Sequence, residues 1–193
     1  MMAALDAETI MLATEDVLRR FGPSKATVVD VARSLGVSHA AVYRHFSSKA
    51  ALREAVARRF LGRGGGELAA LAGDAHLRPP ERLRAWLTGL YQMKRRSART
   101  DPELFATYRV LVLEHSAVAA EHVAALLAQL EGILADGVAA GDFAVADTAA
   151  MARAVFEATN AFHHPAHVEE WDRPGREELL ADVCTLVVNG LRP

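Results

Sequence analysis

The fold is decided by residues 27–52, which read TVVDVARSLGVSHAAVYRHFSSKAAL. Thr27 is placed to cap one short helix and Ser38 to cap the next, because Ser and Thr hydroxyls accept hydrogen bonds from the first helical N–H groups. A tight turn at residues 35–37, Leu-Gly-Val, lies between the two helices. Two short helices joined by such a turn are typical of a helix-turn-helix.

The second of these helices has two different faces. Val42 and Phe46 fall one turn apart and can anchor the helix to a core. The opposite face presents small or hydrogen-bonding side chains, which suit contacts with base edges and phosphates. These side chains are Ser38, His39, Ala41, Tyr43, Arg44 and His45. This pattern predicts a DNA-binding surface, and the alternative is an ordinary helical hairpin with a solvated basic face.

The distribution of charge supports the DNA-binding interpretation. The chain of 193 residues has 22 Lys and Arg against 24 Asp and Glu, so its average charge indicates no polyanionic partner. Residues 16–63, however, hold 10 Lys and Arg against 3 Asp and Glu. An excess of positive charge confined to the region of the helix-turn-helix is the electrostatic signature of phosphate binding.

Three stretches in this region resemble the DNA-binding domain of the TetR (tetracycline repressor) family: TVVDVA at residues 27–32, LGVS at 35–38 and YRHFSSKAAL at 43–52. The resemblance covers roughly the first 60 residues. It implies that Thr27 and Lys49 contact phosphates and that Tyr43 and His45 pack on the phosphodiester chain. It also implies that the bases are faced by Ser38, His39, Ala40 and Ala41, with Arg44 able to contact either bases or phosphates.

The two alanines distinguish this sequence from relatives with polar residues at those positions. Ala40 and Ala41 offer only apolar contact to a thymine methyl group. We therefore expect base recognition to depend on His39, on Arg44 and on DNA shape.

The rest of the chain repeats apolar residues at helical spacing, so the sequence predicts an all-α protein of about nine helices. A three-helix helix-turn-helix domain is expected over residues 1–50, and a helical ligand-binding and dimerisation domain over 51–193. A first helix is expected to end at Gly22-Pro23, and a glycine run at residues 62–66 is expected to loosen or end the helix before it.

The middle helices carry most of the large aromatic residues, which could line an effector pocket or form ordinary core. The candidate ligand-binding residues are Trp86, Tyr91, Phe105, Tyr108, His115 and Phe156. The inward faces of these helices show no cluster of positive charge. This pattern favours a small hydrophobic or aromatic effector.

By resemblance to the TetR family, the last two long helices, residues 148–162 and 177–191, would pair with their copies in a second subunit. Small and apolar side chains along both helices suit such packing. The candidate dimerisation residues are Met151, Val155, Ala158, Leu179, Val183, Leu186 and Val187. The alternative is that these side chains pack only within one subunit.

Other classes of site have less support. His163 and His167 have i, i+4 spacing, but Pro165 interrupts a helix there, so we expect no metal and no other cofactor. Cys184 is expected to be a buried small side chain, since a single cysteine allows no disulfide within the chain.

The sequence has no phosphate-binding glycine loop, no nucleophile elbow and no catalytic histidine-carboxylate spacing, so we expect no enzyme. It also shows no apolar run long enough to cross a bilayer, and we expect a cytoplasmic protein without a membrane partner. A helical module that binds only other proteins is the remaining alternative.

Together these observations predict a ligand-responsive transcriptional regulator. It would bind a palindromic operator in double-stranded DNA as a homodimer and would be released by a small-molecule effector. Repression is expected, and activation stays open because it depends on where the operator lies.

Overall fold

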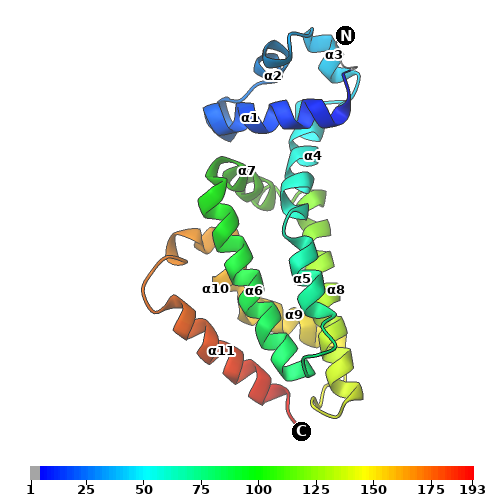
Figure 1. The fold of residues 1–193 in the computed structure, drawn as a ribbon, viewed down its shortest axis with the longest axis vertical. Coiled ribbons are helices and arrows are strands. Elements are labelled where there is room, and N and C mark those ends of the chain that lie inside the picture. Colours follow the sequence, from blue (N-terminus) through cyan, green and yellow to red (C-terminus); the bar gives the residue numbers. More distant parts are fainter. Residues whose placement is uncertain (1–4) are drawn as a thin grey trace. The chain divides into compact units, whose positions relative to one another are not determined.

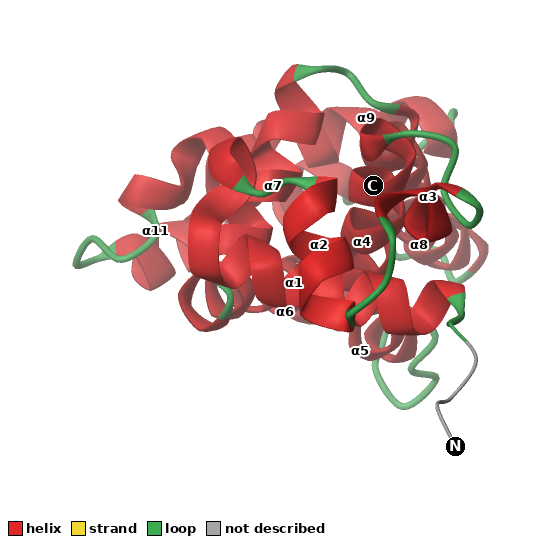
Figure 2. Ribbon diagram, turned by 90° about the horizontal axis from the view of Figure 1, so that it is seen from above, coloured by secondary structure: helices red, strands yellow, loops and turns green. Residues whose placement is uncertain are grey.

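The computed structural model describes residues 5–193, and this part of the chain consists of helices and loops without strands (Figures 1 and 2). The all-α prediction is confirmed, and nine of the helices in the described part have eight or more residues. The elements are α1 (Ala7–Lys25), α2 (Val28–Leu35), α3 (His39–Tyr43), α4 (Lys49–Gly62), α5 (Gly65–Ala72), α6 (Pro79–Thr100), α7 (Pro102–Leu113), α8 (Ala117–Ala139), α9 (Thr148–Ala158), α10 (Asn160–His163), the 3₁₀ helix η1 (Pro165–Glu170) and α11 (Arg176–Leu191).

These helices form two compact units. The first contains the described residues up to Arg63 together with Ala98–Ala120, and the second contains Gly64–Ser97 and Glu121–Pro193. The helices α6 and α8 each contribute residues to both units. The expected division of roles at residue 50 stays a prediction, because compact packing does not by itself report which residues bind DNA or a ligand.

The first unit is built around α1, against which α2, α4 and α7 pack. Its core contains side chains with almost no exposed surface, namely Ile10, Val17, Leu18, Val31, Val42, Leu52 and Val56. The expected break at Gly22-Pro23 is present as a kink, since Gly22 has a left-handed φ of 73° that glycine adopts at little cost. One more turn then continues to Lys25.

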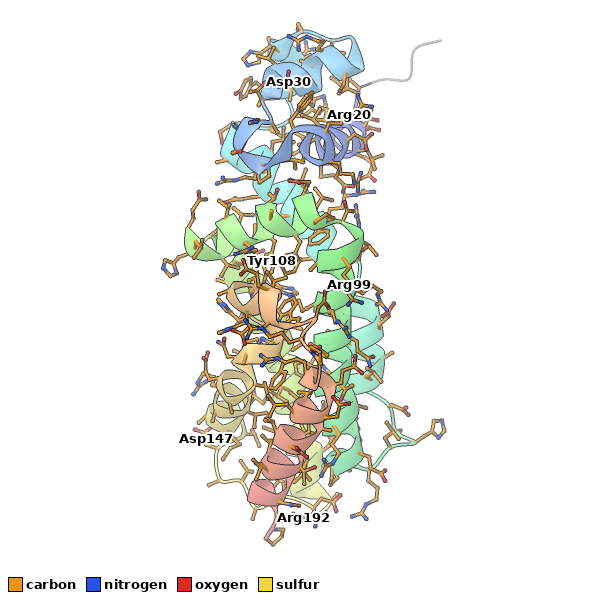
Figure 3. All side chains as sticks on the ribbon, turned by 90° about the vertical axis from the view of Figure 1, so that its left-hand side faces the viewer. Arg20, Asp30, Arg99, Tyr108, Asp147 and Arg192 are labelled. Carbon is orange, nitrogen blue, oxygen red and sulfur yellow. The ribbon has the colours of Figure 1, made fainter. Side chains whose placement is uncertain are left out.

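The caps predicted from the sequence are present. The Thr27 hydroxyl accepts a hydrogen bond from the N–H of Asp30, and the Asp30 carboxylate accepts one from the N–H of Thr27, each at 3.2 Å (Figure 3 labels Asp30). Ser38 accepts a hydrogen bond from the N–H of Ala41 in the same way. Gly36 has a φ of 65° at the turn between α2 and α3. Local hydrogen bonds therefore fix both ends of this turn.

The second unit packs α6 with the later helices around a core of large apolar side chains. Members of this core include Leu83, Trp86, Leu87, Leu90, Leu130, Ile133, Leu134, Trp171, Leu180 and Val188. Asp147 caps α9 through the N–H of Ala150 at 2.8 Å (Figure 3 labels Asp147). Each predicted helix of this region therefore buries one apolar stripe, as expected of amphipathic helices.

At the glycine run α4 ends at Gly62, as expected, and α5, a helix that the sequence analysis did not predict, begins at Gly65. A later helix boundary differs from the sequence-based prediction. The helix expected to run from Asp147 to about Phe162 ends at Ala158, because the hydroxyl of Thr159 donates to the carbonyls of Val155 and Phe156 and the chain restarts as α10.

One helix, α8, is long and apolar enough to pass a test for a membrane span, although Glu121 and Glu131 interrupt its apolar residues. By length and composition Ala117–Ala139 is apolar enough to cross a bilayer, with a mean hydropathy of 1.4 over its most apolar window. The core helix of a globular protein passes the same test, and Leu130, Ile133 and Leu134 of α8 are fully buried here. One such helix is weak support for a membrane span.

Candidate functional site

The helix α3 presents a polar face while its other side is held in the core of the first unit. Val42 is 1% exposed and anchors the helix. His39, Tyr43 and Arg44 are exposed, and the rings of His39 and Tyr43 meet edge-on with centroids 4.7 Å apart. This contact fixes two of the predicted DNA-contacting side chains against each other on the outer face.

Ala41 departs from its predicted place on this face. It is only 6% exposed and packs inward beside Val42. Neighbouring residues of a helix point about 100° apart, and the buried side of α3 is wide enough to include both position 41 and position 42. A base contact by Ala41 is therefore omitted from the proposed interface, whereas Ser38 and Ala40 stay exposed.

Further candidate phosphate contacts flank α3. Thr27, His45 and Lys49 are all exposed, and Lys49 is the first residue of α4. The Ser48 hydroxyl accepts a hydrogen bond from the N–H of Ala51 at 3.0 Å, which fixes the start of this helix. A helix N-terminus favours a bound anion, so a lysine there suits a phosphate.

The predicted ligand-binding residues do not form one described pocket. Trp86, Tyr91 and Phe156 are buried in the second unit. The Tyr91 hydroxyl donates to the carbonyl of Trp171 at 2.7 Å, and the Trp86 indole N–H donates to the Gln129 side chain at 2.9 Å. The protein thus supplies partners for both polar tips, which is typical of core residues.

The other three candidates lie in the first unit. Phe105 and Tyr108 are buried, their ring centroids are 5.8 Å apart, and burial raises the pKa of Tyr108 to about 12 (Figure 3 labels Tyr108). His115 is exposed, with a φ of 52°, because α7 ends at Leu113. The prediction that His115 points inward with the apolar stripe of this helix is therefore wrong.

The structure reveals buried basic side chains that the sequence analysis missed. Lys94 of α6 is 3% exposed, and its Nζ lies 2.7 Å from Nε2 of His122 on α8. His163 of α10 is 5% exposed, with Nε2 3.0 Å from the carbonyl oxygen of Phe156. Basic side chains therefore lie on the inward faces, but their lowered pKa values leave at most Lys94 charged near neutral pH.

Burial weakens the basicity of this group of side chains. It lowers the pKa of Lys94 to about 7. Burial and the charge of Lys94 lower the pKa of His122 to about 3, and mainly burial lowers that of His163 to about 4. A sequence signal existed, since Lys94 follows Leu87 and Leu90 on the apolar stripe of α6 at helical spacing.

The histidines near residue 165 do not assemble as a metal site. The rings of His164 and His167 are 6.3 Å apart, whereas His163 points to Phe156, with ring centroids 4.2 Å apart. Over residues 5–193, no group of three or more His, Cys, Asp or Glu residues is arranged to hold a metal ion. Pro165 separates α10 from η1, so His163 and His167 do not lie on one continuous helix.

Comparison with known proteins decides the family. A model described as "Bacterial regulatory proteins, tetR family" matches residues 10–56. A second, described as "Tetracyclin repressor-like, C-terminal domain", matches residues 79–184, more than half of the chain. The chain belongs to the TetR family of transcriptional regulators. The matching families and relatives are regulators and not enzymes.

Individual relatives of this TetR-family chain agree with that assignment. An uncharacterized HTH-type transcriptional regulator of Mycobacterium tuberculosis, Rv1255c, is 32% identical over 127 residues, which is 64% of this chain and 60% of the relative. The match thus spans less than two thirds of that relative's length.

Solved structures share the fold at lower identity. A Rhodococcus protein of unknown function has a TM-score of 0.75 and 22% identity, covering 97% of this chain and 95% of its own. The regulator FadR of Bacillus subtilis, solved with stearoyl-CoA, has a TM-score of 0.70 and 18% identity, covering 97% of this chain and all of its own.

The helices expected to pair in a TetR-family dimer leave apolar side chains uncovered. Leu186 of α11 is 72% exposed and Leu179 is 47% exposed, whereas Val155 of α9 is only 4% exposed. Ala158 is exposed, and Met151, Val183 and Val187 are half-buried. Val155 belongs to the core of its own subunit and is omitted from the candidate dimer surface, while the other six side chains stay available.

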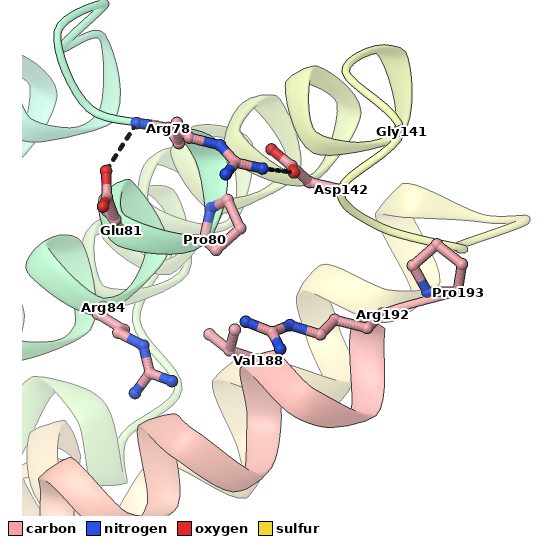
Figure 4. A pocket seen from close by; sticks show the side chains of 9 residues that line it. All are labelled: Arg78, Pro80, Glu81, Arg84, Gly141, Asp142, Val188, Arg192 and Pro193. Carbon is pink, nitrogen blue, oxygen red and sulfur yellow. Dashed lines mark hydrogen bonds and ion pairs between the residues drawn. The ribbon is translucent and has the colours of Figure 1, made fainter.

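A solvent-facing pocket of about 420 Å³ also lies in the second unit (Figure 4). Its lining residues are Arg78, Pro80, Glu81, Arg84, Gly141, Asp142, Val188, Arg192 and Pro193. Arg78 pairs with Asp142, and its backbone N–H donates to Glu81. The mixed charge of this lining does not match the apolar effector pocket expected from the sequence.

Proposed function

We propose that this protein is a ligand-responsive transcriptional repressor. It binds a palindromic operator as a homodimer and is released by a small hydrophobic or aromatic effector. Residues 1–50 read DNA, and residues 51–193 bind the effector and form the dimer. The observation that carries the proposal is the exposed polar face of α3 on a helix that Val42 anchors in the core.

The DNA contacts follow from exposure and chemistry. Ser38, His39, Ala40 and Arg44 face bases or phosphates, and Tyr43 and His45 pack on the backbone. Thr27 and Lys49 hold phosphates on either side. In a dimer the two copies of α3 would enter successive major grooves about 34 to 36 Å apart.

The effector part of the proposal rests on family membership and on the helical second unit. The structure of FadR, which shares this fold, was solved in complex with stearoyl-CoA, a ligand with a long apolar chain. An effector of this protein must bind one conformation of the dimer more tightly than the other, because equal affinity would shift no equilibrium. The cytoplasm, where DNA and metabolites meet, is the compartment that this role requires.

The test is selection of genomic DNA fragments by the purified protein, followed by gel shift at several salt concentrations. Tyr43→Ala and Lys49→Ala are the variants, and Arg173→Ala, which removes an exposed charge from the second unit, is the control. We expect a palindrome that wild type and the control bind equally and that both variants bind more weakly. Failure of the wild type to retain any fragment at low salt would overturn the proposal in favour of a protein-binding module.

A further inference from the structure

A lysine lies in the interior of the second unit, on a helix face whose buried residues are mostly apolar. Lys94 follows Leu90 and Tyr91 by one turn of α6, and both are 1% exposed or less. The Tyr91 ring meets the Phe162 ring edge-on at 6.2 Å. Withdrawing an ammonium group from water into such surroundings costs considerable free energy. A lysine at this position therefore suggests a specific role.

A histidine from another helix contacts this lysine. Nε2 of His122 on α8, a half-buried residue, lies 2.7 Å from the Lys94 Nζ, a hydrogen-bonding distance. Two nitrogen bases from α6 and α8 thus meet, with the lysine fully buried.

The electrostatics of this region oppose positive charge and favour a negative one. Burial lowers the pKa of both groups, and the positive charge of Lys94 lowers that of His122 further. A bound anion would reverse both effects, since it stabilises the ammonium and accepts a hydrogen bond from a histidine N–H group. The site therefore gains most from a ligand with one negative charge.

We propose that Lys94 and His122 bind the carboxylate group of an otherwise apolar effector. One carboxylate oxygen accepts from the Lys94 ammonium and the other from His122, while the apolar body packs among side chains such as Tyr91 and Phe162. A monoanion fits better than a phosphate, because a second negative charge would require a protonated histidine. This inference rests on the proposed function, whose effector it assigns to the organic acids.

Binding at this position would also act on the helices. Nζ of Lys94 and Nε2 of His122 are in direct contact, so donating to a shared carboxylate requires them to separate by roughly 2 Å. The helices α6 and α8 both continue from these residues into the first unit. A change in their separation is therefore a physical route from an acid effector to the DNA-binding helices.

The experiment is titration calorimetry of the full chain with two acids, octanoate and phenylacetate, and with octan-1-ol and 2-phenylethanol as neutral matches. It is run at pH 8 in two buffers of different ionisation enthalpy. We expect at least one acid to bind the wild type tenfold more tightly than its alcohol, with proton uptake. Lys94→Met should lose that tenfold preference and the proton uptake, whereas Lys25→Met, an exposed lysine, should retain both.

Equal affinity for acid and alcohol, or an unchanged acid affinity in Lys94→Met, would overturn the inference, as would failure of both acids to bind. A second measurement needs no variant. The chain has three lysines, few enough for NMR of the isotope-labelled protein to follow each side chain. Octanoate should raise the pKa of Lys94 and leave those of Lys25 and Lys49 unchanged. An unchanged pKa of Lys94 would contradict the inference.

The two proposals fail separately. Operator binding without any response of Lys94 to acids would overturn the carboxylate site and retain the regulator. Acid binding that requires Lys94, in a protein that retains no DNA fragment, would do the reverse.

Discussion

Glu15 of α1 accepts hydrogen bonds from Arg63 just beyond α4, with each carboxylate oxygen 2.5 Å from Nη2. Arg19 and Arg59 also reach Glu15, at 3.1 and 3.2 Å, although Glu15 is only 1% exposed. Asp101, which directly precedes α7, also accepts hydrogen bonds from Arg19 and Arg63. The buried carboxylate of Glu15 therefore pairs with arginines from α1 and from the end of α4. Two of these arginines, Arg19 and Arg63, also pair with Asp101 beside α7.

Glu15→Gln should lower the free energy of unfolding by about 1 to 3 kcal/mol, because the arginines lose a buried countercharge but keep some access to water. Urea unfolding at fixed protein concentration measures this. Glu8→Gln is the matched control on the same helix, where an exposed carboxylate pairs with Arg59. Equal losses in the two variants would show that burial of Glu15 contributes nothing.

Lys49→Ala and His39→Ala should affect DNA binding differently. A phosphate contact does not depend on the base sequence, so Lys49→Ala should weaken binding to operator and random DNA alike. It should also reduce by about one the slope of the logarithm of the binding constant against the logarithm of salt concentration. His39→Ala should change the preferred base at its position. Selection from a randomised operator library, with gel shift across salt concentrations, separates the two. A uniform loss in both variants would contradict the assignment of His39 to a base.

If the protein forms the proposed dimer, Leu186→Glu should convert it to monomer and weaken operator binding. A glutamate on the uncovered face of α11 would bring two like charges into an apolar interface. Sedimentation velocity measures the oligomeric state. Leu113→Glu is the control, because Leu113 is 75% exposed but lies on α7, outside the proposed dimer helices. A dimer that survives Leu186→Glu would place the interface elsewhere.

Lys94→Met should stabilise the fold, and the gain should shrink as pH rises. The folded pKa of about 7 lies below the ordinary value of 10.5, so the unfolded chain binds more protons between these pH values. Wild-type stability should therefore rise by up to about 1.4 kcal/mol per pH unit above pH 7, and Lys94→Met should lack this contribution. Denaturant unfolding of both proteins at pH 7 and pH 9 checks the sign. If the difference in unfolding free energy between the two proteins is the same at pH 7 and pH 9, the lowered pKa of Lys94 is contradicted.

Alanine at Gly65 and Gly66 should reduce the response of operator binding to an effector, because it stiffens the start of α5. A Cβ at either position meets open space. Gly64 must be left unchanged, since its Cβ would overlap Met93. Gel shift with and without effector measures the response of the double variant. An undiminished response would show that this segment is not a hinge.

Much of the first unit could be predicted because its signals are local. The caps at Thr27 and Ser38 join atoms three residues apart, and the turn at Gly36 depends on one backbone conformation. Such interactions form wherever the sequence places them. The same holds for Asp147 at the start of α9. The helix that was expected to continue to Phe162 failed for a local reason too, a threonine hydroxyl that competes for helix carbonyls.

The candidate sites were less predictable, because they depend on which side of a helix meets which neighbour. Ala41 was expected on the exposed face, but the buried side of α3 includes it together with Val42. Aromatic spacing grouped Tyr91 with Tyr108, although packing places them in different units.

The sequence by itself determined the helical class, the helix-turn-helix and its polar recognition face. These features depend on hydrogen bonds and on a periodicity that involve residues close together in the chain. Only the tertiary structure decided that Lys94 is buried against His122, since 28 positions of chain separate them and no local pattern specifies that contact. Burial of charge is a property of the packed interior, where several helices together exclude water.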